Sequence, residues 1–189
     1  KAEPETPEYW CQRVRDAAFE QVEDAADTGT KVHAALEAAV AGEPYDVAAW
    51  GVYVQPVLDL IVHEGLTVTA REKRIVNTDH GFAGTTDLLF THGDGLPGIL
   101  DYKTKKTKPG EKVSAYDEHR LQLAAYGATE YGDATIGRVR AINVFVSTTE
   151  PGRVEFVAHG DLTRDWQAFK LLASLWRYAK GYDPRGAGK

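Results

Sequence analysis

The sequence has one cysteine and no methionine. With Cys11 alone, the 189-residue chain has no internal disulfide and no set of thiolates for a zinc site or an iron–sulfur cluster. Any metal is therefore expected to bind through oxygen and nitrogen ligands. Because methionine is absent even at position 1, we expect residues before Lys1 to be missing.

The chain also lacks a long apolar run and an excess of positive charge. No run approaches the roughly 18 apolar residues that span a membrane, and the first ten residues lack the apolar stretch of a secretory signal. We therefore expect no membrane partner and an intracellular, cytoplasmic protein. Twenty-eight acidic residues against 22 basic ones leave a net charge of −6, which disfavours a protein that coats nucleic acid nonspecifically.

Five of the basic residues nevertheless lie close together, in a segment that also holds Pro109 and Gly110: Lys103, Lys105, Lys106, Lys108 and Lys112. This pattern predicts a basic loop on an acidic body. The loop has two interpretations, a solvated segment that keeps the protein soluble or a local grip on DNA.

Length and a globular composition, with 43% hydrophobic and 26% charged residues, predict a single domain over residues 1–189. Residues 1–65 are predicted to be mainly helical, with helices over 9–26, 29–42 and 46–64; Gly51 and Pro56 should kink or split the last of these. Residues 66–160 predict a sheet, with a hairpin of strands 66–76 and 81–90, a short strand 98–102, a crossing helix 115–131 and strands 139–147 and 153–160. A closing helix is predicted over 161–181. The fold class is α/β (α+β), a mixed sheet of about five strands flanked by helices, with an extra helical segment at the N-terminus.

Two aspartates and a lysine carry the chemistry of the sequence. Asp101 and Lys103 form a D-x-K triplet at the end of a short strand, where alternate side chains point to the same side of the sheet. About one to two such triplets are expected by chance in this composition, so the triplet gains meaning only together with Asp87, in the apolar strand GTTDLLF. Asp87 has a plain alternative as a strand-edge residue bonded to a turn.

Two neighbouring carboxylates cannot both stay ionised in a partly buried site unless a cation lies between them. Hard oxygen ligands suit one or two Mg²⁺ or Mn²⁺ ions, and an added imidazole makes Mn²⁺ attractive. His33, four residues before Glu37 on a predicted helix, can supply that imidazole, although a lone helical histidine is more often a surface or core residue.

Four segments, GTKVHAALE, GFAGTTDLLF, ILDYKTKK and HRLQLAAYG, together resemble the RecB-like branch of the PD-(D/E)XK nuclease superfamily. That branch includes the nuclease domains of recombination helicases, CRISPR-adaptation nucleases and phage exonucleases. The resemblance implies a restriction-endonuclease-like core with His33, Asp87 and Asp101 as metal ligands, completed by the main-chain carbonyl of Tyr102. It makes Lys103 the residue that acts on the attacking water or the phosphate.

The same resemblance places Gln122 and Tyr126, a Q-x-x-x-Y pair, beside the active site and the nucleic acid. It implies a metal-dependent deoxyribonuclease, most simply an exonuclease of recombination, repair or phage DNA processing, that leaves 5′-phosphate and 3′-hydroxyl ends. Subtypes that carry an iron–sulfur cluster are not expected, because their four cysteines are missing here, unless segments beyond the ends of this sequence supply them. A recombination partner protein or further copies of the chain are candidate partners.

Several residues are candidates for binding the DNA backbone, namely Lys105, Lys106, Lys108, Lys112 and Arg120. Glu72 is a candidate outer residue of the site, with a plain surface role as the alternative. Two other functions stay open: a catalytically silent module for nucleic-acid binding or assembly, and a metal-dependent hydrolase of small phosphate esters.

Overall fold

The computed structural model describes residues 27–186, so the helix predicted over 9–26 lies outside the described residues. Residues 27–41 are helical and are followed by α2 (Val47–His63). The sheet strands and the remaining helices come next: β1 (Thr67–Asn77), β2 (Phe82–Thr91), β3 (Pro97–Lys105), α3 (Asp117–Tyr131), the 3-10 helix η1 (Ile136–Arg138), β4 (Arg140–Ser147), β5 (Val154–His159) and α4 (Thr163–Lys180). Across residues 27–186, the order of helices and strands agrees with the prediction.

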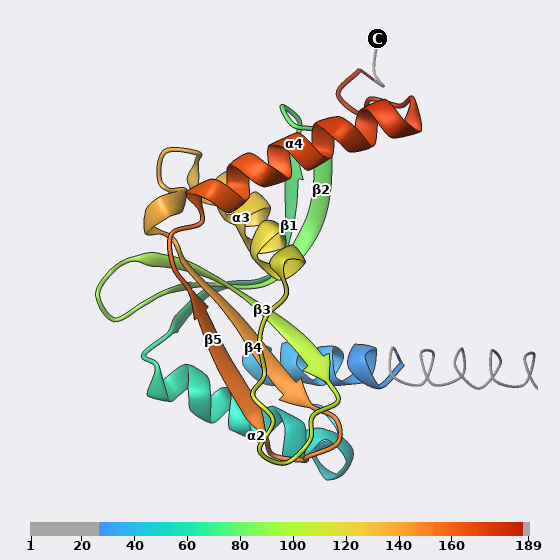
Figure 1. The fold of residues 1–189 in the computed structure, drawn as a ribbon. Helices are drawn as coiled ribbons and strands as arrows, with labels where there is room; N and C mark the ends of the chain where they lie inside the picture. The colour runs from blue at the N-terminus through green and yellow to red at the C-terminus, as the bar shows by residue number, and fades with distance from the viewer. Residues whose placement is uncertain (1–26, 187–189) are drawn as a thin grey trace, which may run out of the picture.

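The five strands form one mixed sheet in the order β1-β2-β3-β4-β5. Neighbouring strands are antiparallel except β3 and β4, which are parallel and are connected through α3. A parallel pair needs such a crossover, whereas an antiparallel pair closes with a short turn. The predicted fold class, a mixed five-stranded sheet flanked by helices, is confirmed (Figure 1).

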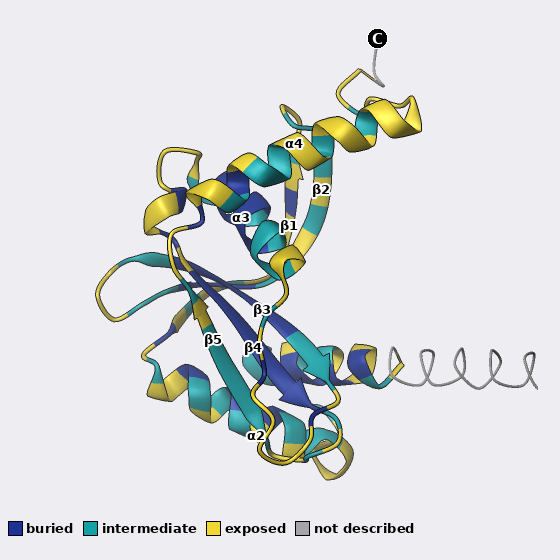
Figure 2. Cartoon of the chain, viewed as in Figure 1, coloured by how far each residue is buried: buried dark blue, intermediate teal, exposed yellow. Residues whose placement is uncertain are grey.

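Each face of the sheet is covered by two helices (Figure 1). Residues 27–41 and α2 pack on one face, where Leu36 and Val57 join Leu100 of β3 in a buried cluster. α3 and α4 pack on the other face, where Leu123 and Trp166 join a second cluster. Because both faces are covered, β3 and β4 are mostly buried on both sides and lie at the centre of the molecule (Figure 2).

Two local predictions differ from the structure. β3 continues to Lys105 rather than ending at residue 102, because its parallel pairing with the buried strand β4 extends to Lys105 opposite Ser147. Lys103 and Lys105 therefore belong to a strand and not to the basic loop. α2 is not split: Pro56 lies inside an uninterrupted helix whose first turn is capped by the Asp46 side chain, which accepts a hydrogen bond from the Ala49 amide at 3.0 Å.

Within the described residues, none of the helices has the length and apolar character that a membrane crossing requires.

Candidate active site

The candidate site lies where β2 and β3 separate. Pairing between these strands ends at Leu88 opposite Leu100, so Asp87 and Asp101 are the next residues beyond the last pair. The Tyr102 amide consequently lacks a ladder partner on β2, and the Asp87 side chain takes that place by accepting its hydrogen bond at 2.6 Å. We call this point, where β2 and β3 separate beyond the Leu88–Leu100 pair, the fork. A buried amide needs a partner, so the separation of the strands at the fork also fixes the position of the Asp87 carboxylate.

His33 reaches the fork from the helix of residues 27–41. Its neighbours Val32 and Leu36 are fully buried against the sheet, which brings the next helix face to the open end of the strands. The Nδ1 atom of His33 lies 3.8 Å from Asp87 Oδ2. Gly29, one turn earlier, permits this approach, because a Cβ there would come within 2.8 Å of Thr104 Oγ1.

Asp101 is buried, at 6% exposure, and is held by donors on two sides. The Lys103 ammonium lies 2.9 Å from Oδ1 and 2.8 Å from Oδ2 of Asp101, and it also donates to Gln122 Oε1 at 3.2 Å. Asn143 of β4 donates to Asp101 Oδ2 at 2.9 Å. The D-x-K pair and the glutamine of the Q-x-x-x-Y pair thus form one hydrogen-bonded group, although they come from β3 and α3.

The charges at the fork are not balanced. Burial, followed by the nearby charge of Asp101, raises the pKa of Asp87 to about 7, against the opposing effects of the Tyr102 amide and the Lys103 ammonium. Burial is also the largest cause that lowers the pKa of His33, so the imidazole is neutral at pH 7 and has a free lone pair to offer a metal. The site thus combines a carboxyl group whose ionised form is disfavoured with a neutral imidazole.

Glu72 also belongs to this site. It lies in β1 between the pairs Arg71–Leu88 and Lys73–Thr86, which places it opposite Asp87. Its φ of 41° falls in the left-handed region that non-glycine residues seldom occupy, a conformation that tends to persist at functional sites.

Glu72 and Asp87 line an open cavity of about 500 Å³ together with His33, Glu37 and Thr104. Burial, and then the charges of Asp87 and Glu37, raise the pKa of Glu72. The sequence signal for Glu72 is the unbroken run of charges at residues 71–74, which interrupts the strand alternation. Glu37 shares the helix face of His33, as its spacing predicts.

Tyr126 lies against Gly84 of β2. A Cβ on Gly84 would come within 1.9 Å of the Tyr126 hydroxyl, so the glycine of the G-x-x-D motif makes room for the tyrosine of the Q-x-x-x-Y motif. Gly84 is three residues before Asp87, and Gln122 precedes Tyr126 by one helical turn. The two motifs are therefore packed together at the fork.

The basic loop between β3 and α3 is anchored to the turn between β4 and β5. Thr107 is buried and shares a hydrogen bond of 2.6 Å with Ser147, and Arg153 donates to the Lys108 carbonyl at 3.0 Å. This anchoring leaves the lysines Lys106, Lys108 and Lys112 exposed. Lys105 differs, because its ammonium stacks over the Tyr116 ring at 4.8 Å.

Arg120 is engaged elsewhere in the molecule. Its guanidinium binds both carboxylate oxygens of Asp165 on α4, at 2.9 and 2.6 Å, and does not join the lysines of the basic loop. The structure thus gives Arg120 a role in attaching α4 to α3, which the sequence does not indicate. Its predicted contact with DNA stays a prediction.

The donors at the fork fit a hard divalent cation. Carboxylate oxygens of Asp87 and Asp101 and the neutral imidazole of His33 are ligand types that Mg²⁺ and Mn²⁺ accept, and a cation would relieve the charge conflict at Asp87. The site is not a preformed cage: over residues 27–186, no three His, Cys, Asp or Glu side chains surround one point closely enough to hold a metal. Lys103 lies against both oxygens of Asp101, so a metal ion would have to share this carboxylate with the ammonium or displace the ammonium from one oxygen.

Comparisons with known proteins identify no family. No protein-family model matches the chain, and no curated protein matches it significantly. Among solved structures, the chain is similar to a repair endonuclease from Pyrococcus abyssi, with 23% identity, a TM-score of 0.32, and coverage of 58% of this chain and 42% of that one. It is also similar to the protein SSO0001, with 16% identity, a TM-score of 0.31, and coverage of 62% and 56%. The chain thus spans about half the length of these structures.

Proposed function

We propose that this protein is a metal-dependent deoxyribonuclease that hydrolyses phosphodiester bonds, most simply as an exonuclease. The observation that carries the proposal is the fork between β2 and β3. It gathers two carboxylates, a neutral imidazole and a lysine from three separate elements, next to an open cavity of about 500 Å³. A structural ion pair would not need an open cavity or an imidazole.

His33, Asp87 and Asp101 are the residues that would hold Mg²⁺ or Mn²⁺, with the Tyr102 carbonyl as the fourth donor that the family resemblance implies. The chemistry that such an ion supplies is polarisation of the phosphodiester and acidification of a bound water. The pKa of about 7 at Asp87 supports this assignment, because a site that repels its own second negative charge gains most from a cation.

Lys103 is the group proposed to act on the substrate. Its ammonium is already oriented by Asp101 and by Gln122 Oε1, which reduces the freedom it must lose when it meets a phosphate. There it can orient the attacking water or neutralise charge that develops on the phosphate in the transition state. Tyr126 supports the fork from behind, through its contact with Gly84.

The exposed lysines of the basic loop, Lys106, Lys108 and Lys112, are proposed to bind the phosphate backbone. They lie on the segment that directly follows β3, the strand that carries Lys103. A DNA strand bound along this loop would therefore extend towards the fork. Such contacts position DNA without reading its sequence. They are compatible with the net charge of −6, because the positive charge is needed only along one path.

The test is cleavage of end-labelled linear DNA and of circular DNA with Mg²⁺, Mn²⁺ or EDTA. The variants are Asp87→Asn and Lys103→Met, with Asp79→Asn as the matched control because Asp79 is an exposed aspartate in the turn before β2. We expect wild-type protein and the Asp79 variant to degrade linear DNA only when a divalent ion is present. Lys103→Met should lower the rate at least about 100-fold, as loss of a transition-state contact does, while DNA binding is retained.

The alternatives give different results. Cleavage of circular DNA would indicate an endonuclease. Absence of cleavage of both substrates, together with equal DNA binding by wild type and the Asp87 variant, would contradict the proposal and favour a catalytically silent DNA-binding module.

A further inference from the structure

A chain of hydrogen bonds runs from the Asp101 carboxylate to the far side of the sheet. Asn143, completely buried on β4, donates from Nδ2 to Asp101 Oδ2 at 2.9 Å. Its Oδ1 lies 2.8 Å from Nε2 of His159, at the end of β5. The Nδ1 atom of His159 lies 3.4 Å from the guanidinium of Arg120, which is paired with Asp165.

The groups at the two ends of this chain of hydrogen bonds determine which atom donates in each bond. A carboxylate only accepts and a guanidinium only donates, so Asn143 must present its amide N–H to Asp101 and its carbonyl to His159. The same argument makes His159 Nδ1 an acceptor, which leaves its single proton on Nε2. Burial, then the charge of Arg120, lowers the pKa of His159 to about 4, so the ring is neutral and carries that one proton at pH 7.

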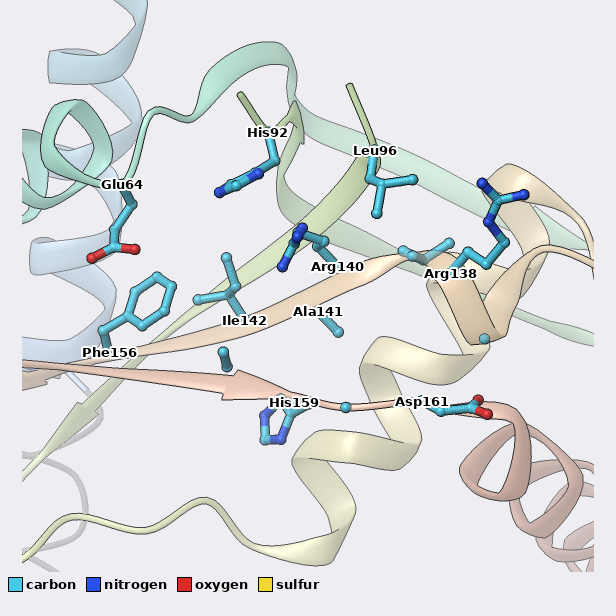
Figure 3. Close-up of a pocket in the computed structure, with 14 residues that line it drawn as sticks. Glu64, His92, Leu96, Arg138, Arg140, Ala141, Ile142, Phe156, His159 and Asp161 are labelled. Atoms are coloured by element: carbon cyan, nitrogen blue, oxygen red, sulfur yellow. The ribbon is translucent and has the colours of Figure 1, made fainter. Parts of the chain in front are cut away.

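The outer end of the chain is accessible. His159 lines a cavity of about 560 Å³ that also includes Arg140 and Asp161, and Figure 3 shows it at the border of this cavity. The inner end is closed, because Asn143 has no exposed surface and its amide oxygen and nitrogen both have partners. A buried amide with all its partners has one orientation, and so does the carboxylate that it binds.

From these contacts we propose that Asn143 and His159 are positioning residues that fix the Asp101 carboxylate for metal binding and hydrolysis. The inference rests on the proposed nuclease function. Lys103 holds the solvent side of Asp101, and Asn143 holds the other side. If a metal ion were to share Asp101 with Lys103 or displace it, Asn143 would keep the carboxylate in place. Neither residue touches the substrate.

The first experiment reads the hydrogen-bond direction in metal-free protein. Long-range ¹H–¹⁵N NMR spectra of the imidazole distinguish the two neutral tautomers of His159. We expect the Nε2–H tautomer near pH 7, with exchange of its proton slowed by the bond to Asn143. If the ring is the Nδ1–H tautomer, or exchanges freely between the two tautomers, the proposed chain of hydrogen bonds from Asp101 to His159 is wrong, whether or not the protein cleaves DNA.

The second experiment compares His159→Gln with His159→Leu. The glutamine amide keeps an N–H donor for Asn143 Oδ1, whereas leucine has a similar volume and no donor. Titration calorimetry with Mn²⁺ alone should show the leucine variant binding about 10-fold or more weakly, because such outer partners of metal ligands contribute 10- to 100-fold. The glutamine variant should remain within about threefold of wild type, and metal-saturated DNA cleavage should follow the same order.

Equal Mn²⁺ affinity and equal cleavage in the two variants would contradict the positioning role while leaving the nuclease function intact. A loss of unfolding free energy in the leucine variant without a change in Mn²⁺ affinity would contradict it as well, since that is the signature of a purely structural contact. Wild-type protein that binds no Mn²⁺ and cleaves no DNA would instead contradict the proposed function.

Discussion

Replacement of Asp87 by asparagine should stabilise the metal-free protein. The Asp87 side chain accepts the Tyr102 amide hydrogen bond, which an asparagine carbonyl can also accept, so Asp87→Asn removes the charge and keeps the contact. A carboxyl whose pKa rises from 3.8 to about 7 on folding takes up a proton when the protein folds. Ionisation of Asp87 must therefore cost the wild-type protein stability, relative to Asp87→Asn, as the pH rises through that interval.

The size of the effect follows from linkage. Each pKa unit corresponds to about 1.4 kcal/mol, so the full shift sets an upper limit of about 4 kcal/mol above pH 7. The Asp87 side chain retains 13% exposure, and water on that side reduces the expected gain to about 2 kcal/mol. Near pH 4 most of the gain should be gone, because Asp87 is then protonated in the native state and close to half protonated in the unfolded state.

Urea unfolding in EDTA at pH 4 to 8 measures this difference directly. Asp101→Asn is the informative contrast, because Asp101 is bound by Lys103 and Asn143 and neutralising it leaves the ammonium without its partner. Asp79→Asn controls for the change in net charge. An Asp87 variant no more stable than wild type at pH 8, or a gain that does not change with pH, would refute the idea that the fork stores charge repulsion.

Three further predictions concern other parts of the molecule. Gly84→Ala should destabilise the protein by at least about 2 kcal/mol in urea unfolding, because the new methyl group meets the Tyr126 hydroxyl. Adding Tyr126→Leu should recover a large part of that loss. If the losses of the two single variants simply add in the double variant, the contact between residues 84 and 126 is contradicted. Measured relative to His159→Gln, the stability of the wild-type protein should fall by about 1–2 kcal/mol, after allowance for solvent screening, as the pH drops from about 6.5 to about 4. The reason is that the unfolded chain binds a proton at His159 that the folded one, with a pKa of about 4, does not; the comparison with the variant removes the opposite contribution of Asp87, and a difference between the two proteins that does not change with pH would contradict the assignment. Lys106, Lys108 and Lys112 are the three exposed lysines of the basic loop. Replacing all three by glutamine should reduce the slope of the logarithm of the duplex DNA binding constant against the logarithm of the salt concentration by about 2–3. An unchanged slope would argue against the loop as the DNA contact.

The sequence by itself was sufficient for the order of elements over residues 27–186, because the change from helical to alternating spacing is a local property. It also indicated His33, Asp87, Asp101 and Lys103 as a group, although none of these residues is informative alone. Their roles stay predictions until metal binding and cleavage are measured. The end of β3 was placed too early, because its last three residues are held in the strand by pairing with β4, more than 40 residues away in the chain.

Only the tertiary structure decided how the site is built. Nothing in the local pattern indicates that β2 and β3 separate at Leu88 and Leu100 or that Asp87 replaces a ladder partner for Tyr102. The same holds for Asn143 and His159, which read as ordinary strand residues until β4 and β5 bring them behind Asp101. The physical reason is that periodicity reports which side of an element is buried, whereas strand register and helix packing decide which buried polar groups meet.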